Sequence, residues 1–324
     1  MKIANSNSER SSGINTNRKT RSAPVRMLIR LIKEKPLGTA GAVITLALLL
    51  IGLFANQLAP YPPNAPHVVD ALAAPSAKYI LGTDNLGRDL LSRIIFGARI
   101  SVVVGLVGAL ISVSLSTILG TLCGYFGGKF DLLVQRFVDA WMCFPGMVII
   151  LVVMSILGQG MWQVILVLGI QTGISGSRVV RSAVIGIKGN VYLQAAVAIG
   201  GSTPQILAKH VLPNILAPII IMFSMAVPNM IMSESGLSFL GYGIPPPTPS
   251  WGGMLSGSAR AFMFMAPWMA IWPGVALAFV VYGVNMFGDA LRDILDPRLR
   301  GGVGRYGVKV KKAVSIKSNP GTPQ

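Results

Sequence analysis

The sequence predicts an all-α integral membrane protein with six transmembrane helices. Apolar residues make up 52% of the 324 residues, charged residues only 12%, and the mean hydropathy is +0.63. A soluble domain needs more polar surface than this composition supplies. Six apolar stretches approach the roughly 20 residues that a membrane-spanning helix requires. They cover residues 37–58, 100–125, 137–157, 161–177, 216–232 and 262–287.

The first apolar stretch follows a basic segment and therefore resembles a secretory signal peptide in outline. Its core, residues 38–55, is long enough to span a bilayer. The nearest small-x-small triplet, Ala71-Leu72-Ala73, lies too far downstream to serve as a cleavage site. We expect a retained first helix.

The third stretch, residues 137–157, contains Pro145 in its interior and Asp139 near its start. Proline removes one helical hydrogen bond and bends a helix. The residues before it still keep an apolar helical face. We expect one helix with a kink.

The formal charge of +17 is concentrated at the two ends of the chain. Nine of the 28 basic residues lie in residues 1–36 and eight in residues 288–324. Basic residues that flank spans collect on the cytoplasmic side, so we expect both termini there. No platform of aromatic and basic residues accompanies the charge, which excludes a nucleic-acid partner.

The inventory of reactive side chains predicts no catalytic, cofactor-binding or metal site. Two cysteines (Cys123, Cys143) and two histidines (His67, His210) are too few and too scattered for a disulfide framework or a metal cluster. The predicted spans contain almost no ionisable residue, which argues against a proton relay or an ion-coupled carrier. The chain has no phosphate-binding loop of the Gly-x-x-x-x-Gly-Lys-Ser/Thr type, so it cannot itself hydrolyse ATP by that route.

Glycines recur at intervals of four residues in or just after two predicted spans. They are Gly120, Gly124 and Gly128, and then Gly169 and Gly173. This spacing allows helix backbones to approach closely in lipid. We therefore predict helix packing rather than a channel lining at these positions.

A polar segment, residues 178–214, separates the fourth and fifth spans. Residues 191–199 are compatible with a helix, Gly200-Gly201 is a break, and Ser202-Thr203-Pro204 is a helix start with proline at its first position. We expect Leu212-Pro213 to end this second helix before the next span.

Small residues in this segment suit a projection that docks into a groove on another protein. Ala195, Ala196 and Ala198 allow close approach, and Gly200 permits a turn that a side chain would hinder. The alternative is an interfacial helix in which the alanines only favour helix formation.

The spacing of this segment resembles the "EAA" loop of ATP-binding-cassette importer permeases: two alanines, three residues, a glycine, and Leu-Pro further on. The resemblance implies an ATPase-coupling loop. Its residues are Gln194, Ala195, Ala196, Ala198, Gly200, Leu212 and Pro213. Gln194 departs from the family, which usually has glutamate here; an amide still hydrogen-bonds but offers no charge to a basic groove.

Further motifs resemble the dipeptide/oligopeptide/nickel branch of these permeases and its second, "C-type" subunit. They lie at residues 82–89, 97–101, 237–241, 246–252 and 288–299, so the resemblance covers about residues 30–300.

Two of these motifs are expected at the outer face. The first contains Gly82, Asp84, Gly87, Arg88 and Asp89. It lacks the ligand pattern of a calcium loop. We expect a turn in which Thr83 or Asp84 caps a helix leading into the second span.

The second outer motif is the proline run at residues 245–249, with Pro247, Pro249 and then Trp251. We expect a stiff, extended segment anchored by an interfacial Trp251. Plain rigidity and a role in an outer gate or in docking a binding protein both remain open. Residues 289–299 are expected to form a cytoplasmic helix that stops before Pro297.

We divide the chain into a basic cytoplasmic segment (1–36), the first helix with its outer loop (37–99), a five-helix permease core (100–290) with the coupling loop at 178–215, and a cytoplasmic tail (291–324).

The resemblance implies a type I, MetI-like importer permease rather than an enzyme. Its implied task is to pass di- or oligopeptides across the cytoplasmic membrane of a bacterium or archaeon. The implied partners are a homologous permease subunit, two ATP-binding cassette subunits and an extracytoplasmic solute-binding protein, with lipid around them. Import of nickel or another small solute is the alternative within the class, and a secondary carrier without an ATPase is the alternative outside it.

Overall fold

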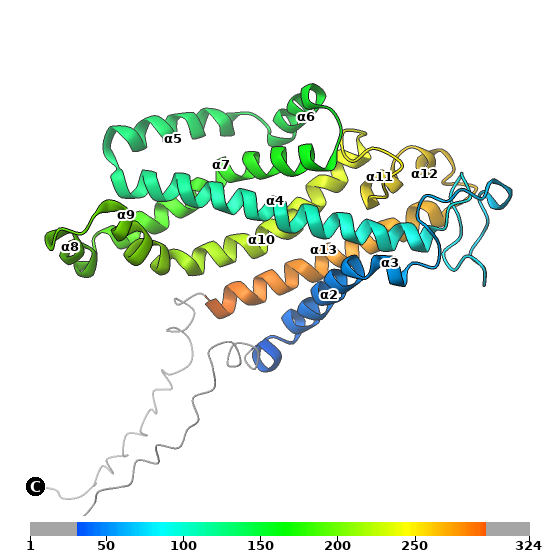
Figure 1. Cartoon of the computed structure of the whole chain (residues 1–324), viewed down its shortest axis with the longest axis horizontal. Coiled ribbons are helices and arrows are strands. Elements are labelled where there is room, and N and C mark those ends of the chain that lie inside the picture. Colours follow the sequence, from blue (N-terminus) through cyan, green and yellow to red (C-terminus); the bar gives the residue numbers. More distant parts are fainter. Residues whose placement is uncertain (1–30, 296–324) are drawn as a thin grey trace, which may run out of the picture.

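The computed structural model describes residues 31–295, which fold as a bundle of long helices (Figure 1). Within this part of the chain, five helices are long and apolar enough to cross a bilayer. They are α2 (Pro36–Leu53), α4 (Leu90–Phe126), α7 (Met161–Lys188), α10 (Leu212–Phe239) and α13 (Trp268–Leu295). A sixth span results if α5 (Gly128–Cys143) and α6 (Gly146–Leu157) are counted together. The predicted all-helical membrane fold is confirmed.

The predictions for the basic segment before residue 31 and for the tail after residue 295, including the helix end before Pro297, lie outside the described residues. The division of the chain into four segments stays a prediction.

The long helices run side by side in Figure 1, with short elements gathered at the two ends of the bundle. Helix α4 packs along α7, α2 packs along α13, and α10 contacts α4, α7 and α13. At one end lie α8 (Val191–Ala198), α9 (Thr203–Ile206) and the π-helix η2 (Leu207–Val211). At the other end lie α3 (Ala55–Leu58), η1 (Val68–Asp70), α11 (Trp251–Leu255) and α12 (Ser258–Ala261). The 37 residues of α4 make a rod about 55 Å long, which separates these two ends.

Glycines allow α4 and α7 to pack closely together. A Cβ on Gly120 would lie 2.5 Å from the carbonyl oxygen of Ser177, and one on Gly124 would lie 2.8 Å from Val184. On the facing helix, Gly169 and Gly173 meet side chains of α4 at 2.8 and 2.9 Å. The predicted packing role is confirmed at these four positions.

Gly128 does not share that role. A Cβ on this residue would meet nothing within 4 Å, and its φ of +59° lies in the left-handed region. It belongs to the turn between α4 and α5, where glycine is needed for backbone conformation rather than packing.

The expectation of one kinked helix for the third span is wrong. Helices α5 and α6 meet at an angle of 88°. Phe144 is extended, with ψ of 140°, because the ring of Pro145 disfavours helical backbone in the residue before it. The chain therefore breaks completely, and α6 contributes Ile150 and Met154 to the core formed by α4, α7 and α10.

The second and the last spans begin at other residues than predicted. The second helix starts at Leu90 rather than at residue 100, because the cap at Asp89 starts a helix before the apolar run. The last span starts at Trp268 rather than at residue 262, since Pro267 interrupts the preceding turn.

Gly120→Ala is expected to destabilise the bundle by about 1–3 kcal/mol, because its methyl group would overlap the backbone of α7. Gly186→Ala is the matched control, since this exposed helical glycine of α7 has open space around it. That change should be neutral or stabilising by up to about 1 kcal/mol. Thermal unfolding of the purified variants in detergent measures both, and equal melting temperatures would contradict the packing role.

Candidate functional site

The predicted coupling segment forms a helix, a turn and a second helix at one end of the bundle. Helix α8 ends at Ala198, and Gly200 follows with φ of +80°. The Gly201 N–H donates to the Ala196 carbonyl at 3.1 Å, which closes the helix C-terminus. The glycine turn is thus present, and the surrounding space is open. A side chain at residue 200 would strain the left-handed backbone conformation but would not clash with neighbouring atoms.

Helix α8 has one face in the bundle and one face in the open. Leu193 and Ala196 are buried and pack in a cluster with Val184 of α7 and Ile215 of α10. Ala196 therefore faces inward, unlike Ala195 and Ala198, which are exposed. The exposed face also carries large apolar side chains. They are Val191, Val197 and Ile199, with exposed fractions of 80%, 54% and 86%.

Gln194 lies on the exposed side of α8, where its amide donates weakly to the Gly189 carbonyl at 3.4 Å. It lines a shallow cavity of about 480 Å³ between α8 and the end of α4. Lys188 lines the same cavity, and its ammonium donates to the Tyr125 carbonyl at 2.5 Å. This cavity therefore carries an amide and a cation.

The expectation that Leu212-Pro213 ends the second helix is wrong. Pro204 is the second residue of α9 rather than its first, and Ser202 makes no side-chain cap. From Thr203 the chain stays helical to Phe239. The π-helix η2 widens the turn just before Pro213, which lies in the first turn of α10. The segment therefore joins the fifth span without a break.

Ion pairs bind α5 to the part of α7 that leads into α8. The Arg181 guanidinium donates to both carboxylate oxygens of Asp131, at 2.6 and 2.5 Å. One turn earlier, Arg178 contacts a single carboxylate oxygen of Asp139. The sequence places both arginines in the polar segment after the fourth span, whereas they lie on a helix that continues to Lys188.

At the opposite end of the bundle, Asp84 organises the first outer motif. One oxygen of its carboxylate accepts from the backbone N–H groups of Leu86 and Arg88, at 2.9 and 3.0 Å. The other oxygen accepts from Nε of Arg88 at 2.7 Å. Gly82 and Gly87 have φ of +80° and +73°, so the turn around Asp84 requires glycine on both sides.

The predicted helix cap is corrected from Thr83 or Asp84 to Asp89. The Asp89 carboxylate accepts from the backbone N–H of Ser92 at 2.8 Å and from its hydroxyl at 2.6 Å. Thr83 instead joins two parts of the loop. Its hydroxyl donates to the Asp70 carbonyl at 2.6 Å and accepts from the Ala73 N–H. The cap of α4 lies after the turn because the Asp84 carboxylate already accepts hydrogen bonds within the turn.

Asp70 forms an exposed charge cluster in the same loop. Its carboxylate accepts from the Lys78 ammonium at 2.7 Å and from the Tyr79 hydroxyl at 2.9 Å. These two bonds lower the pKa of Asp70 below its usual range, and the bond to Asp70 raises the pKa of Lys78.

Trp251 is buried rather than interfacial, with 2% of its surface exposed. Its indole N–H donates to the Ile94 carbonyl at 3.0 Å, and its ring lies where a Cβ on Gly97 would be 2.8 Å away. The expectation of a lipid-facing anchor is wrong because α4 supplies both a hydrogen-bond acceptor and a glycine for this ring.

The proline run is not extended throughout. It turns at Pro246-Pro247, and residues on either side of the turn, Ile244 and Pro249, are buried. The Ile244 N–H donates to the hydroxyl of Ser238 at 3.2 Å. These contacts draw the segment back over the end of α10.

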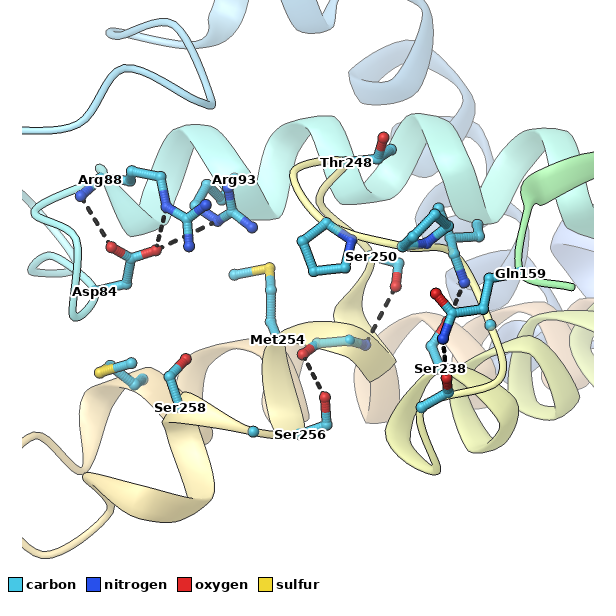
Figure 2. Close-up of a pocket in the computed structure, with 18 of the residues that line it drawn as sticks. Asp84, Arg88, Arg93, Gln159, Ser238, Thr248, Ser250, Met254, Ser256 and Ser258 are labelled. Atoms are coloured by element: carbon cyan, nitrogen blue, oxygen red, sulfur yellow. Dashed lines mark hydrogen bonds and ion pairs between the residues drawn. The ribbon is translucent and has the colours of Figure 1, made fainter.

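The two outer motifs meet at a cavity of about 320 Å³, shown in Figure 2. Asp84, Arg88 and Arg93 line one end of it, and Gln159 and Ser238 line the other. Of the predicted outer residues, only Asp84 and Arg88 line the cavity. The second motif contributes neighbours of its predicted residues. They are Pro245, Pro246, Thr248 and Ser250.

Sequence reasoning missed Glu234, a fully buried acid within α10. Its carboxylate accepts from the Ser238 hydroxyl at 2.7 Å and lies 3.4 Å from that of Ser235. The predicted fifth span ended at residue 232, which left Glu234 outside the membrane. The spacing of Glu234 and Ser238, four residues apart on a helix, is the signal that places them on one face.

Residues 116–301 match the family described as binding-protein-dependent transport system inner membrane component. The chain belongs to this family. The permease is therefore a transport subunit of ABC importers and not an enzyme, and its family works with ATPase subunits and a substrate-binding protein at the inner membrane. A carrier without an ATPase is not favoured.

Relatives cover most of the permease. The dipeptide transport system permease protein DppC of Alkalihalophilus pseudofirmus is 36% identical over 278 residues, which cover 86% of this chain and 91% of that protein. The glutathione transport system permease protein GsiD of Pectobacterium atrosepticum is also 36% identical, over 86% of this chain and 92% of that protein. A solved structure of the MetNI methionine ABC transporter, in inward-facing conformations, matches with a TM-score of 0.51. It is 16% identical and covers 63% of this chain and 96% of that chain. At this identity the likeness shows the fold alone.

Asp70→Asn is expected to make residues 59–89 more susceptible to limited proteolysis. Because the folded pKa of Asp70 is lowered, its contribution is complete above about pH 4 and is lost as the pH falls further. Because the pKa of Lys78 is raised, the pair persists up to about pH 10 and is lost above it. The difference in protease sensitivity between Asp70→Asn and wild type should therefore be constant between about pH 5 and 9.

Asp293→Asn provides the control, since this residue forms an exposed pair with Lys35 outside that loop. A protease sensitivity that is unchanged by Asp70→Asn at neutral pH would contradict the role of the cluster.

Proposed function

We propose that the permease forms half of the translocation pathway of an importer for di- or oligopeptides. A homologous permease subunit forms the other half, and two ATPase subunits bind ATP and dock on α8. The names of the dipeptide and glutathione relatives support a peptide substrate. The observation that carries the coupling role is the position of α8 at one end of the bundle, with a buried face and an exposed apolar face.

Through its buried face, α8 can transmit a displacement to the helices of the bundle. Leu193 and Ala196 pack against Val180 and Val184 of α7 and against Ile215 of α10. Because interiors are closely packed, a displacement of α8 moves both helices with it. The ion pairs of Arg178 and Arg181 extend the rigid unit to α5. Closure of the ATPases would therefore tilt several helices together, as a two-state rigid-body switch.

We assign the end that carries α8 to the cytoplasm, with both termini on that side. The start of α2 and the end of α13 point toward the α8 end of the bundle in Figure 1. Lys35 and Asp293 hold these two chain ends together, with 2.6 Å between Nζ and Oδ2. The basic residues of both terminal segments favour the cytoplasmic side. The 59–89 loop, α11, α12 and the 320 Å³ cavity then face outward.

Reconstitution tests this function. Proteoliposomes that hold this chain, its partner permease and two ATPase subunits should accumulate dipeptides when ATP is inside and loaded binding protein is outside. Nickel in place of the dipeptide is the substrate control. ATP-dependent uptake of nickel without uptake of dipeptides would contradict the peptide assignment.

Ile199→Asp is expected to weaken ATPase association on the order of ten-fold or more, because it places a charge on the exposed apolar face at the end of α8. The helix itself should fold, since Ile199 is 86% exposed. Val69→Asp is the matched control, as this fully exposed residue lies at the opposite end of the bundle. Co-purification of the ATPases with each variant measures the effect.

Ala196→Asp should behave differently and lower folding stability, because Ala196 is buried against α7 and α10. Normal ATPase association of Ile199→Asp would contradict the assignment of this face.

A further inference from the structure

One end of the outer cavity holds two guanidinium groups and a single carboxylate (Figure 2). Nε of Arg88 lies 2.7 Å from Oδ2 of Asp84, and Nε of Arg93 lies 3.7 Å from the same oxygen. All three side chains are largely buried, with exposed fractions of 14%, 7% and 6%. The charged groups that line the cavity therefore sum to one positive charge.

The two arginines have different surroundings. Arg93 is engaged with the chain itself, because Nη1 donates to the Pro63 carbonyl at 3.0 Å and to Asn64 at 3.3 Å. Arg88 donates to Asp84 through Nε alone, and within residues 31–295 its two terminal nitrogens donate no hydrogen bond. A guanidinium has five N–H donors, so most donors of Arg88 are available to a ligand in the cavity.

Nearby acids do not balance this charge from within the cavity. Asp89 is committed to the N-terminus of α4, and Asp70 is committed to Lys78 and Tyr79. Glu234 lies behind Ser238 and does not line the cavity. A partly buried positive charge is stabilised by an anion that accepts its hydrogen bonds. The planar guanidinium of Arg88 suits a carboxylate in particular.

The rest of the lining suits the remainder of a small amphipathic molecule. Apolar side chains are supplied by Leu90, Ile244, Met254 and Met269, and hydroxyl groups by Thr248, Ser250, Ser256 and Ser258. The volume of about 320 Å³ lies at the lower end of the range for small-molecule pockets, about 300–1,000 Å³. The cavity can therefore hold a carboxylate at one end with an apolar side chain and amide groups beyond it.

We propose that this cavity is a subsite for the carboxylate end of a short peptide, and that Arg88 is its carboxylate-binding residue. The inference rests on the proposed function of peptide import and places part of the selectivity in the permease itself. The ligand would bridge three segments: the start of α4, the loop after α10, and the start of α13 with Met269.

Direct binding tests the proposal on the complete permease–ATPase complex in lipid nanodiscs, without the binding protein. The probes are the dipeptide Ala-Ala and its C-terminal amide, measured by equilibrium dialysis. Wild type is expected to bind Ala-Ala about ten-fold more tightly than the amide, since a charge-assisted hydrogen bond is lost with the amide. Arg88→Gln should reduce this preference to less than about two-fold, mainly by weakening the binding of Ala-Ala.

Two further variants separate Arg88 from general charge and from folding. Arg260→Gln removes an exposed arginine of α12 that does not line the cavity, and it should keep the ten-fold preference. Arg88→Lys keeps the charge without the planar fork and should keep only part of the preference. If Arg88→Gln does not assemble with the ATPases, Arg88→Lys and the wild-type preference decide the question.

A wild-type complex that binds both probes equally, or an Arg88→Gln complex that keeps the full preference, would overturn the subsite. Uptake of Ala-Ala into proteoliposomes, measured in parallel, keeps this result distinct from the proposed function. Uptake without a carboxylate preference overturns the subsite alone. Absence of ATP-driven uptake by wild type overturns peptide import and the peptide subsite with it.

Discussion

Helices α4 and α7 lie so close together that a methyl group would overlap the opposite helix at five glycine positions, the four described above and Gly176. In a bilayer, lipid tails are as apolar as leucine, so helices associate through close packing rather than through the exclusion of water. The contact between α4 and α7 therefore supplies the central pair on which the rest of the bundle is assembled. Helix α10 packs against both members of the pair, and α13 with α2 packs on α10 and α4.

Polar interactions supplement this packing where the bundle approaches water. At the end that carries α8, the bidentate pair of Arg181 and Asp131 fastens α5, most of which is exposed, to α7. At the other end, Asp84 satisfies two backbone N–H groups and one guanidinium nitrogen in a single turn. Both arrangements use charge-assisted hydrogen bonds, which are stronger than neutral ones. Each holds a segment whose own apolar contacts are few.

Features that depend on local pattern could be predicted from the sequence, and features that depend on distant partners could not. The apolar spans, the glycine turn at residue 200 and the glycine contacts of α4 and α7 follow from composition and spacing. Trp251 looked interfacial because its acceptor on Ile94 lies 157 residues away in the chain. Ala196 looked like part of a docking surface because nothing near it in sequence shows that Val184 and Ile215 cover it.

In the candidate sites, too, local features could be predicted from the sequence and contacts between distant segments could not. The two outer motifs were recognised separately, but their meeting at one cavity required the fold. Glu234 was missed because the predicted span ended at residue 232, seven residues before the end of α10 at Phe239. The break at Pro145 was underestimated, since a proline in an apolar run gives no measure of how far the chain will bend.

The unbroken length of α4 has a consequence for how the two ends of the molecule communicate. Its first turn carries Leu90 and Arg93, which line the outer cavity, and its last turn carries Tyr125 and Phe126 beside α8. Within α4 no proline interrupts the helix, so it moves as a stiff lever rather than as two hinged halves. Any free energy by which a ligand at one end favours a particular tilt of this lever must, by linkage, appear equally in binding at the other end. Because α4 extends from one membrane surface to the other, it can couple binding at the two surfaces reciprocally without a chain of intermediate contacts.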